Sequence, residues 1–225
     1  MNNKLIFDLG CYTLDSTNKY LNDNYKVIAV DADKENIDLV NERYKNFVEN
    51  QQLITINKAI TLESGDLVDF YIQPNMKVWS SLNKNIAERT QSSIKTTIET
   101  TTLKDLINEF GTPWYCKIDI EGADILALIS LEDSEKEKLP KIISCETECL
   151  GVGETTEGLD VVNQLYKLGY TKFLLKKQPI RTVFSIENNN EWYSFEEIVE
   201  QLVDLRRKHY FNEFFDFWYD VYATY

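Results

Sequence analysis

Three acidic residues of this chain each follow an apolar segment that has the length of a β-strand. The acids, each with the segment before it, are Asp31 (residues 26–30), Asp119 (114–118) and Glu146 (140–145). In open α/β sheets, ligands bind outside the carboxyl ends of the strands. A carboxylate there can accept a hydrogen bond from a ribose hydroxyl or take a proton from a reacting group. The spacing therefore predicts a binding or catalytic site along one edge of a sheet.

Lys117, Asp119 and Glu121 alternate along the second of these segments, which ends at Gly122. Successive side chains of a strand point to opposite faces, so these three side chains share one face. Two acids and a lysine at the end of a strand are poorly explained as core residues. An ion pair with a purely structural role is the alternative interpretation.

The first turn of the chain, residues 7–17, follows an apolar strand and carries Asp8 and Gly10. A helix, a second strand and Asp31 come next, which is the order of elements that opens a nucleotide-binding α/β sheet. Gly10 has no Cβ atom, so the backbone there can approach a ligand closely. An ordinary strand–helix–strand unit with an empty crevice is the alternative.

The cofactor class is narrowed by two missing motifs. The first turn lacks the Gly-x-Gly-x-x-Gly pattern of dinucleotide sites, and the chain has no Gly-Lys-Ser/Thr loop of the P-loop type. A nucleoside cofactor without phosphates fits better, because it needs an acid for the ribose and little anion cradle.

Strands and helices alternate along the whole chain, which predicts a single α/β domain over residues 1–225 with a mostly parallel sheet. The apolar spacing predicts further helices at residues 33–47, 103–110, 123–131, 155–168 and 198–205. It predicts further strands at residues 52–60, 67–72, 96–102, 170–175 and 182–186, the last two as a pair that adds an antiparallel element. Asp33 is a plausible N-cap for the first of these helices.

Two segments stand apart from this alternation. Residues 74–97 are polar, and we expect a long loop that acts as a lid or contacts the acceptor, with a plain surface loop as the alternative. Residues 206–225 form an aromatic tail that we expect to pack over the sheet edge. The alternative for the tail is stacking on an acceptor sugar, and it could also serve a homo-oligomer.

The composition argues against several classes of protein. The 37 acidic and 24 basic residues give a formal net charge of −13, so nucleic acid is not an expected partner. The single histidine and the absence of a Cys-x-x-Cys pair argue against a zinc site, and the four cysteines suggest buried thiols in the cytoplasm. No apolar run approaches the length of about 18 residues that spans a bilayer, and the N-terminus has no signal-peptide pattern.

The motifs of the chain, taken in order, resemble those of the FkbM-type S-adenosylmethionine-dependent methyltransferases. The first motif of that family, Phe-Asp-Ile-Gly-Ala-Asn-x-Gly-x-Asp-Thr, aligns with residues 7–17 without gaps. Its most recognisable motif, Lys-Ile-Asp-Ile-Glu-Gly, is matched at every position by residues 117–122. Shorter matches lie at residues 20–21, 27–33, 57–60, 80–82 and 218–223.

The resemblance implies a Rossmann-like class I methyltransferase fold, S-adenosyl-L-methionine as cofactor and a saccharide-like hydroxyl as acceptor. The residues implied to bind the cofactor are Asp8, Gly10, Thr17, Asp31, Ala32 and Asn57. The residues expected to contact the acceptor are Ser80, Ser81 and Trp218. The expected catalytic residues are Asp119 or Glu146 as general base, with Lys117 and Glu121 as orienting groups.

The first motif departs from the family at three positions: Tyr12 replaces an Asn, Leu14 the second Gly and Ser16 an Asp. Leu14 adds bulk to the turn that would approach the methionine end of the cofactor. One alternative is therefore a degenerate relative that serves as a binding or scaffold module. A second alternative is a metal-assisted enzyme, although no metal is expected in the favoured interpretation. Its ligands would be Asp119, Glu146 and Glu148.

Overall fold

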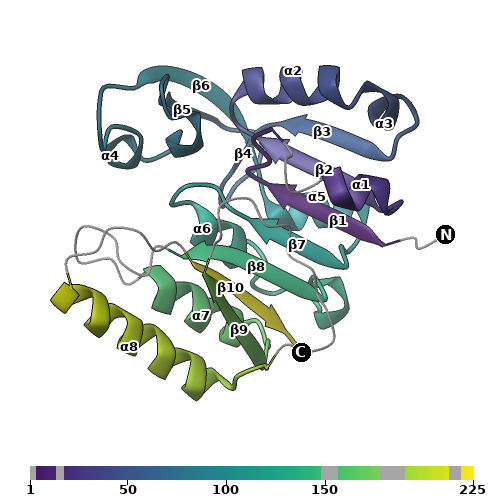
Figure 1. The fold of residues 1–225 in the computed structure, drawn as a ribbon. Coiled ribbons are helices and arrows are strands. Elements are labelled where there is room, and N and C mark those ends of the chain that lie inside the picture. The colour runs from purple at the N-terminus through teal and green to yellow at the C-terminus, as the bar shows by residue number, and fades with distance from the viewer. Residues whose placement is uncertain (1–3, 14–17, 148–156, 178–190, 213–218) are drawn as a thin grey trace.

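A computed structural model gives the fold of the chain, which Figure 1 shows as a ribbon. It describes residues 4–13, 18–147, 157–177, 191–212 and 219–225. Within these residues a seven-stranded sheet has the order β3-β2-β1-β7-β8-β10-β9. Its strands are β1 (Leu5–Leu9), β2 (Lys26–Asp31), β3 (Leu53–Asn57), β7 (Tyr115–Ile118), β8 (Ile142–Thr147), β9 (Lys172–Lys177) and β10 (Tyr219–Thr224).

The strands from β3 to β8 run parallel, whereas β10 is antiparallel to both of its neighbours, β8 and β9. The predicted fold, a mostly parallel sheet with an antiparallel element near the end, is confirmed. The antiparallel strand itself is not the predicted one. It is formed by the aromatic tail, and the predicted strand at residues 182–186 lies outside the described residues.

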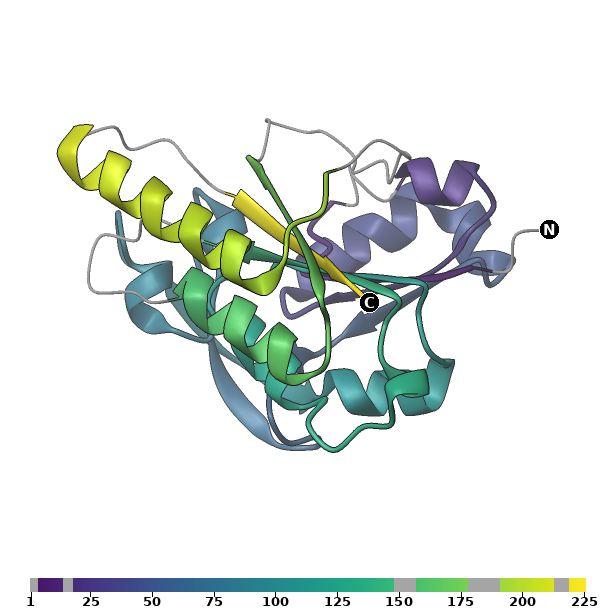
Figure 2. The ribbon, with the colours of Figure 1, turned by 90° about the horizontal axis from the view of Figure 1, so that it is seen from below.

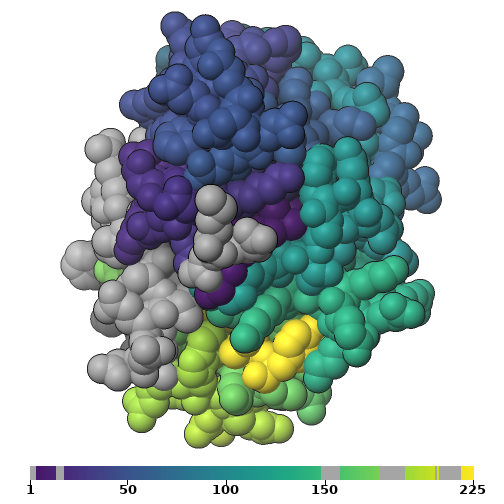
Figure 3. Space-filling model, turned by 90° about the vertical axis from the view of Figure 1, so that its right-hand side faces the viewer, coloured from purple at the N-terminus to yellow at the C-terminus, as the bar shows by residue number. Residues whose placement is uncertain are grey.

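Strand β10 lies inside the sheet rather than over its edge. Val221 and Ala223 are fully buried on one face, and Tyr222 is buried on the other. Thr224 pairs with Ile142, the first residue of β8, so β10 ends where the parallel strands begin. Figure 3 looks onto the side of the molecule where the parallel strands begin, and it shows the yellow C-terminal end surrounded by green segments. Residues 219–224 of the tail are therefore part of the sheet, whereas residues 206–212 belong to the helix Phe195–Asn212.

Helices cover both faces of the sheet, as Figure 2 shows. One face carries α1 (Asn18–Asn22), α2 (Lys34–Arg43) and α3 (Lys45–Glu49), and the other α5 (Leu103–Phe110), α6 (Asp124–Ile129), α7 (Glu157–Lys167) and α8 (Phe195–Asn212). Strand residues alternate between the two layers, so that Ile6 packs in one and Phe7 in the other. The predicted burial of the cysteines is confirmed for Cys11, Cys116 and Cys145.

Helix ends follow the expected capping chemistry. Asp33 is the N-cap of α2, as predicted, and its side chain accepts a hydrogen bond from the backbone N–H of Glu35. Thr102 caps α5 in the same way, and Gly111, with φ of 96°, ends that helix. These bounds agree with the predicted helix at residues 103–110 because both of its ends carry strong signals.

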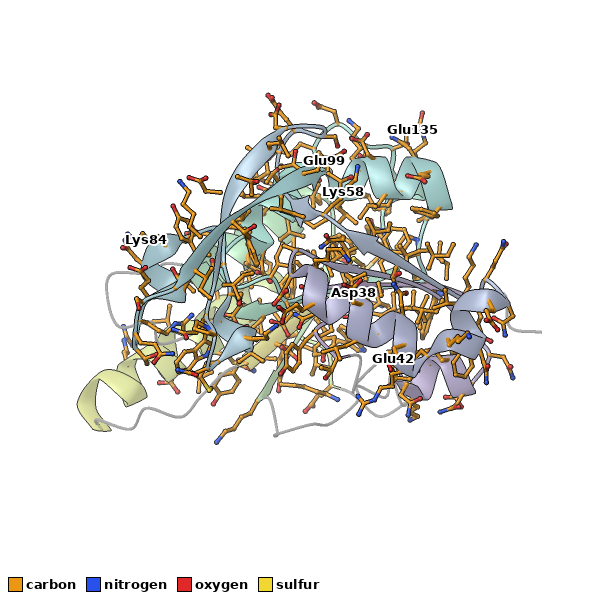
Figure 4. All side chains as sticks on the ribbon, turned by 90° about the horizontal axis from the view of Figure 1, so that it is seen from above. Asp38, Glu42, Lys58, Lys84, Glu99 and Glu135 are labelled. Carbon is orange, nitrogen blue, oxygen red and sulfur yellow. The ribbon has the colours of Figure 1, made fainter. Side chains whose placement is uncertain are left out.

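A smaller sheet, β4-β6-β5, lies beside the carboxyl ends of the central strands (Figure 1). Its strands are β4 (Ala59–Ile60), β5 (Leu67–Ile72) and β6 (Ile94–Thr101). The single strand predicted at residues 52–60 is divided between the sheets, because Asn57 pairs with Asp31 whereas Ala59 pairs with Thr100. Lys58, at the division, forms an ion pair of 2.6 Å with Glu99, and both are labelled in Figure 4.

Residues 74–97 are more regular than the sequence predicts. They contain the 3₁₀-helix η1 (Lys77–Trp79), the helix α4 (Lys84–Ala87) and the start of β6; a second 3₁₀-helix, η2 (Lys136–Lys138), lies further along. The buried Gln73 side chain donates hydrogen bonds to the carbonyls of Ala87 (3.1 Å) and Gln91 (3.2 Å). Hydrogen bonds from this amide thus join the start of the segment to its later residues. Such contacts leave no periodic pattern in the sequence.

Gly10 lies where the end of β1 meets the end of β7. Its φ is 78°, and a Cβ atom added there would lie 1.7 Å from the carbonyl oxygen of Asp119. The Gly10 N–H donates a hydrogen bond of 2.9 Å to Val30 in β2. The sequence predicts a close backbone approach at this glycine, and the group that approaches is another strand of the protein itself.

Replacing Gly10 with alanine should destabilise the fold strongly. Gly65 is a matched control, because its φ is 89° but nothing lies within 4 Å of an added Cβ atom. The left-handed conformation alone costs about 1–2 kcal/mol for an alanine, so Gly65→Ala should lose about that much. Gly10→Ala should lose about 3 kcal/mol or more. Equal losses in the free energy of unfolding, measured by urea denaturation, would contradict the close approach.

Candidate active site

A cavity of about 320 Å³ opens at the carboxyl ends of the central strands. It is bounded by the turn after β1, the ends of β2 and β7, Glu146 of β8, the small sheet and the segment around η1. The residues that line it are Gly10, Tyr12, Val30, Asp31, Ala32, Asn36, Lys58, Ala59, Ile60, Phe70, Lys77, Val78, Trp79, Ser80, Leu82, Asp119, Ile120, Glu121, Ala123 and Glu146. Three predicted strand-end acids thus meet in one cavity.

Asp31 forms the β2 side of the cavity and is held in place by three donors. Its Oδ2 accepts a hydrogen bond from the Tyr12 N–H (2.9 Å), and its Oδ1 accepts from the Asp33 N–H (2.8 Å) and the Asn36 amide (3.3 Å). Burial raises the pKa of Asp31 to about 6, although the hydrogen bonds from Asp33 and Tyr12 oppose the rise. The carboxylate is therefore fixed in orientation and titrates near neutral pH.

Ala32 and Asn57 lie next to Asp31 but differ in their relation to the cavity. Ala32 lines it, whereas Asn57 is not among the lining residues. The Asn57 amide donates hydrogen bonds to the carbonyls of Asp31 (2.9 Å) and Ala32 (3.1 Å). Asn57 therefore holds the end of β2 in shape from behind.

Asp8 and Lys117 lie behind the β7 side of the cavity. Asp8 is buried, does not line the cavity, and has its Oδ1 3.8 Å from the Lys117 ammonium. Lys117 also contacts Oδ2 of Asp119 at 2.8 Å. Burial disfavours the charge on Lys117, but the carboxylates of Asp119 and Asp8 outweigh it, so its pKa is raised. Lys117 is thus a cation shared by two carboxylates.

Asp119 and Glu146 form a carboxyl pair that faces the cavity. Burial opposes the charge on Asp119, but Lys117 and a hydrogen bond with Glu146 outweigh it and lower the pKa of Asp119. Burial and the neighbouring charge of Asp119 raise the pKa of Glu146 well above its usual value. When the pair holds a single proton, that proton therefore lies on Glu146, which donates it in a hydrogen bond to Asp119.

Glu121 completes a group of three carboxyls with Asp119 and Glu146, whose oxygens lie within 4.8 Å of one another. Two of them have a cationic neighbour: Asp119 contacts Lys117, which it shares with Asp8, and Glu121 lies 3.1 Å from the Arg89 guanidinium. The raised pKa of Glu146 lowers the charge of the third. The charge of the group is therefore compensated in part by the chain itself.

The two serines predicted to contact the acceptor differ in their relation to the cavity. Ser80 lines the cavity, and its hydroxyl accepts a hydrogen bond from the Gln73 N–H (3.1 Å). Ser81 is buried, and its hydroxyl donates to the carbonyl of Glu121 (2.6 Å). Ser81 thus fastens the η1 segment to the turn after β7, where Glu121 has a φ of 49°.

Several predicted residues lie outside the described part of the chain: Thr17, Trp218, Leu14, Ser16 and Glu148. Lys77 and Trp79 also line the cavity and were not predicted to do so, although they directly precede the Ser-Ser-Leu motif. Lys77 contacts Asp33 (3.1 Å) and Glu35 (2.6 Å) at the start of α2. These two residues could have been predicted, because they are a lysine and a tryptophan within residues 74–97, the segment expected to cover the site.

The strand order, with one antiparallel strand inserted between the last two parallel ones, defines the fold of class I methyltransferases. The solved "METTL16 MTase domain" has a TM-score of 0.50 to this chain at 7% identity, over 99% of this chain and 60% of that one. The family model described as "Methyltransferase FkbM domain" matches residues 3–172. The chain belongs to the FkbM methyltransferase family, as its motifs predict.

Two further solved structures are similar. Precorrin-6y C5,15-methyltransferase from Geobacter metallireducens GS-15 has 10% identity and a TM-score of 0.45, over 98% of this chain and 78% of that one. The human methyltransferase 10 domain containing protein has 8% identity and a TM-score of 0.47, over 100% and 72%. No curated protein sequence matches the chain significantly. None of the helices that the structure describes is both long and apolar enough to cross a bilayer.

Replacing Lys117 with methionine should destabilise the protein at neutral pH by about 3 kcal/mol, because Asp8 and Asp119 lose their shared cation. Lys117 lowers the folded-state pKa of Asp119, so this stabilisation is present above the unfolded-state pKa and is lost as pH falls. The loss should therefore shrink toward pH 3. Lys34→Met, at an exposed ion pair with Asp38, is the control and should change stability by less than about 1 kcal/mol. Denaturation curves across pH measure both, and a pH-independent loss at Lys117 would contradict the charge arrangement.

Proposed function

We propose that the protein is an S-adenosylmethionine-dependent O-methyltransferase that methylates a hydroxyl of a saccharide-like acceptor. One observation supports this most: Asp31 and the Asp119–Glu146 pair line the same cavity. The first is suited to ribose hydroxyls and the second to the removal of a hydroxyl proton. Membership of the FkbM family supports the same reaction.

The residues present fit this cofactor. Both Asp31 oxygens are oriented by N–H donors, and Oδ2, which accepts from Tyr12, keeps a lone pair that a ribose hydroxyl can use. Gly10 and Ala32 add little bulk to that wall, and the cavity volume lies in the range of about 300–1,000 Å³ typical of small-molecule sites. Asp8, expected to contact the cofactor, acts in this proposal through Lys117. Thr17 remains a proposed contact.

The cofactor supplies a methyl group on a positively charged sulfur, which is a good leaving group. The residues of the cavity would hold the acceptor oxygen in line with that methyl group, so that a C–O bond could form as the C–S bond breaks. Asp119 takes the hydroxyl proton as general base, a contribution of about 10²–10⁴ in rate. Most of the remaining acceleration comes from positioning.

The assignment of Asp119 as base follows from the charges of the carboxyl pair. At Asp119 the neighbouring Lys117 outweighs burial and lowers the pKa, whereas burial raises the pKa of Glu146, so a single proton on the pair lies on Glu146. The pair can therefore take one more proton, and Asp119 is the group that can receive it. Glu121, held by Arg89, and Lys117 orient the pair.

The charge distribution supports an uncharged acceptor. The net charge of −13 and the acids of the cavity disfavour polyphosphates and nucleic acid. Because Lys117 and Arg89 already pair with two of the three carboxyls, we propose a reaction without a metal ion, and activity should be insensitive to chelators. Ser80 remains the proposed hydroxyl contact to the acceptor, while Ser81 acts through the backbone of Glu121.

Cofactor affinity should depend on the ionisation of Asp31. With its pKa near 6, the carboxylate becomes protonated as pH falls, and its hydrogen bonds to ribose hydroxyls weaken. The affinity for S-adenosylhomocysteine should fall by up to about tenfold between pH 8 and pH 5. The Asp31→Asn variant should bind more weakly and without this pH dependence. Calorimetric titration measures both, and a pH-independent wild type would contradict the role of Asp31.

Asp119→Asn should reduce methyl transfer to saccharides by about 10²–10⁴. S-adenosylhomocysteine affinity should stay within about threefold of the wild type, because Asp119 acts on the acceptor. Glu146→Gln is the comparison and should cost less, since glutamine can still donate to Asp119. Transfer of a labelled methyl group to a panel of saccharides measures the rates. Full activity in Asp119→Asn would remove Asp119 as base, and a wild type that fails to bind S-adenosylhomocysteine would favour the non-catalytic binding module.

A further inference from the structure

Trp79 lines the cavity, yet the proposed reaction gives it no role. The Arg89 guanidinium lies over its ring, with Cζ 5.1 Å from the ring centroid. Arg89 is not among the residues that line the cavity, and it is itself fixed by the carbonyl of Ile86 (3.1 Å) and the carboxylate of Glu121 (3.1 Å). A cation over an indole face attracts the ring. Trp79 is therefore held in position at the wall before any ligand arrives.

The η1 segment spans the cavity from the cofactor side to the acceptor side. At one end, Lys77 contacts Asp33, two residues after the proposed ribose ligand Asp31. At the other end, Trp79 is linked through Arg89 to Glu121, two residues after the proposed base Asp119. Ser81 adds a hydrogen bond to the Glu121 carbonyl. Trp79 is thus tied to the wall where the acceptor hydroxyl would be activated.

We propose that Trp79 is a specificity-determining residue whose ring is the platform for the sugar ring of the acceptor. This rests on the proposed function and deepens it. A pyranose ring presents C–H groups on a face and hydroxyls around its edge. An aromatic ring covers the face, while carboxylates meet the edge. Because Arg89 already orders the indole, little side-chain entropy is lost when the sugar stacks on it.

The test uses protein saturated with S-adenosylhomocysteine and three probes: the methyl glycosides of glucose, mannose and rhamnose. Saturation-transfer NMR reports which probe contacts the protein, and titration gives its apparent affinity. Trp79→Ala should weaken the best probe by about tenfold or more, since it loses both buried area and aromatic contact. Trp79→Phe should retain most of the affinity.

Tyr166→Ala is the control. Tyr166 is another partly exposed aromatic residue, stacked on Phe195 with ring centroids 4.2 Å apart, and it does not line the cavity. This variant should bind the probe like the wild type. S-adenosylhomocysteine affinity should stay within about threefold in all three variants, which also verifies that they are folded.

Three results would overturn the proposal alone: no probe contacts the loaded wild type, Trp79→Ala binds the probe unchanged, or Trp79→Ala weakens S-adenosylhomocysteine by about tenfold. The last would assign Trp79 to the adenine, because base–aromatic stacking is worth about 1–3 kcal/mol. A wild type that does not bind S-adenosylhomocysteine would instead overturn the proposed function, and this proposal with it.

Discussion

The backbone contact between Gly10 and Asp119 fixes the geometry on which the rest of the site depends. At this point β1 is bound to both of its neighbours, since the Asp119 N–H donates to Leu9 (3.0 Å) and the Gly10 N–H to Val30 (2.9 Å). Asp31 follows Val30 directly, so the two strand ends that carry the site are joined through one turn. The distance between the ribose side and the acceptor side is therefore set by strand packing rather than by a loop.

The same arrangement concentrates acids, and the chain compensates part of their charge. Lys117 is shared by Asp8 and Asp119, and burial together with the charge of Asp119 raises the pKa of Glu146, which favours its protonated form. Buried like charges could not otherwise remain ionised at such short distances. This compensation leaves one carboxylate that can accept a proton beside one that cannot. The electrostatics of the fold and the chemistry of the proposed reaction are thus the same set of interactions.

Much of this could be predicted from the sequence because the signals are local. The strand ends at Asp31, Asp119 and Glu146 are marked by apolar runs that stop at an acid, and parallel strands bring such ends to one edge. The motif matches supplied the family, and the helix at residues 103–110 was bounded by a Thr cap and a Gly. These features need no knowledge of distant contacts.

The rest depends on contacts that the sequence does not encode locally. Strand β10 was predicted to be a tail because its aromatic residues hide the alternation of its side chains between the two faces of the sheet. That alternation is understood only once the strand is placed between β8 and β9. Asn57 and Ser81 were assigned to ligands, yet they donate to the backbone of Asp31, Ala32 and Glu121. The motif gives their position but not their partner. Trp79 was not predicted to line the cavity, because its contact with Arg89, ten residues further along, leaves no local signal.

The central claim is that one cavity holds both the cofactor and the group that activates the acceptor. A crystal structure of the protein with S-adenosylhomocysteine tests it most directly. We expect the ribose hydroxyls to lie against the carboxylate of Asp31 and the sulfur to face Asp119 and Glu146. Density for the ligand elsewhere, or with the sulfur turned away from the carboxyl pair, would contradict it.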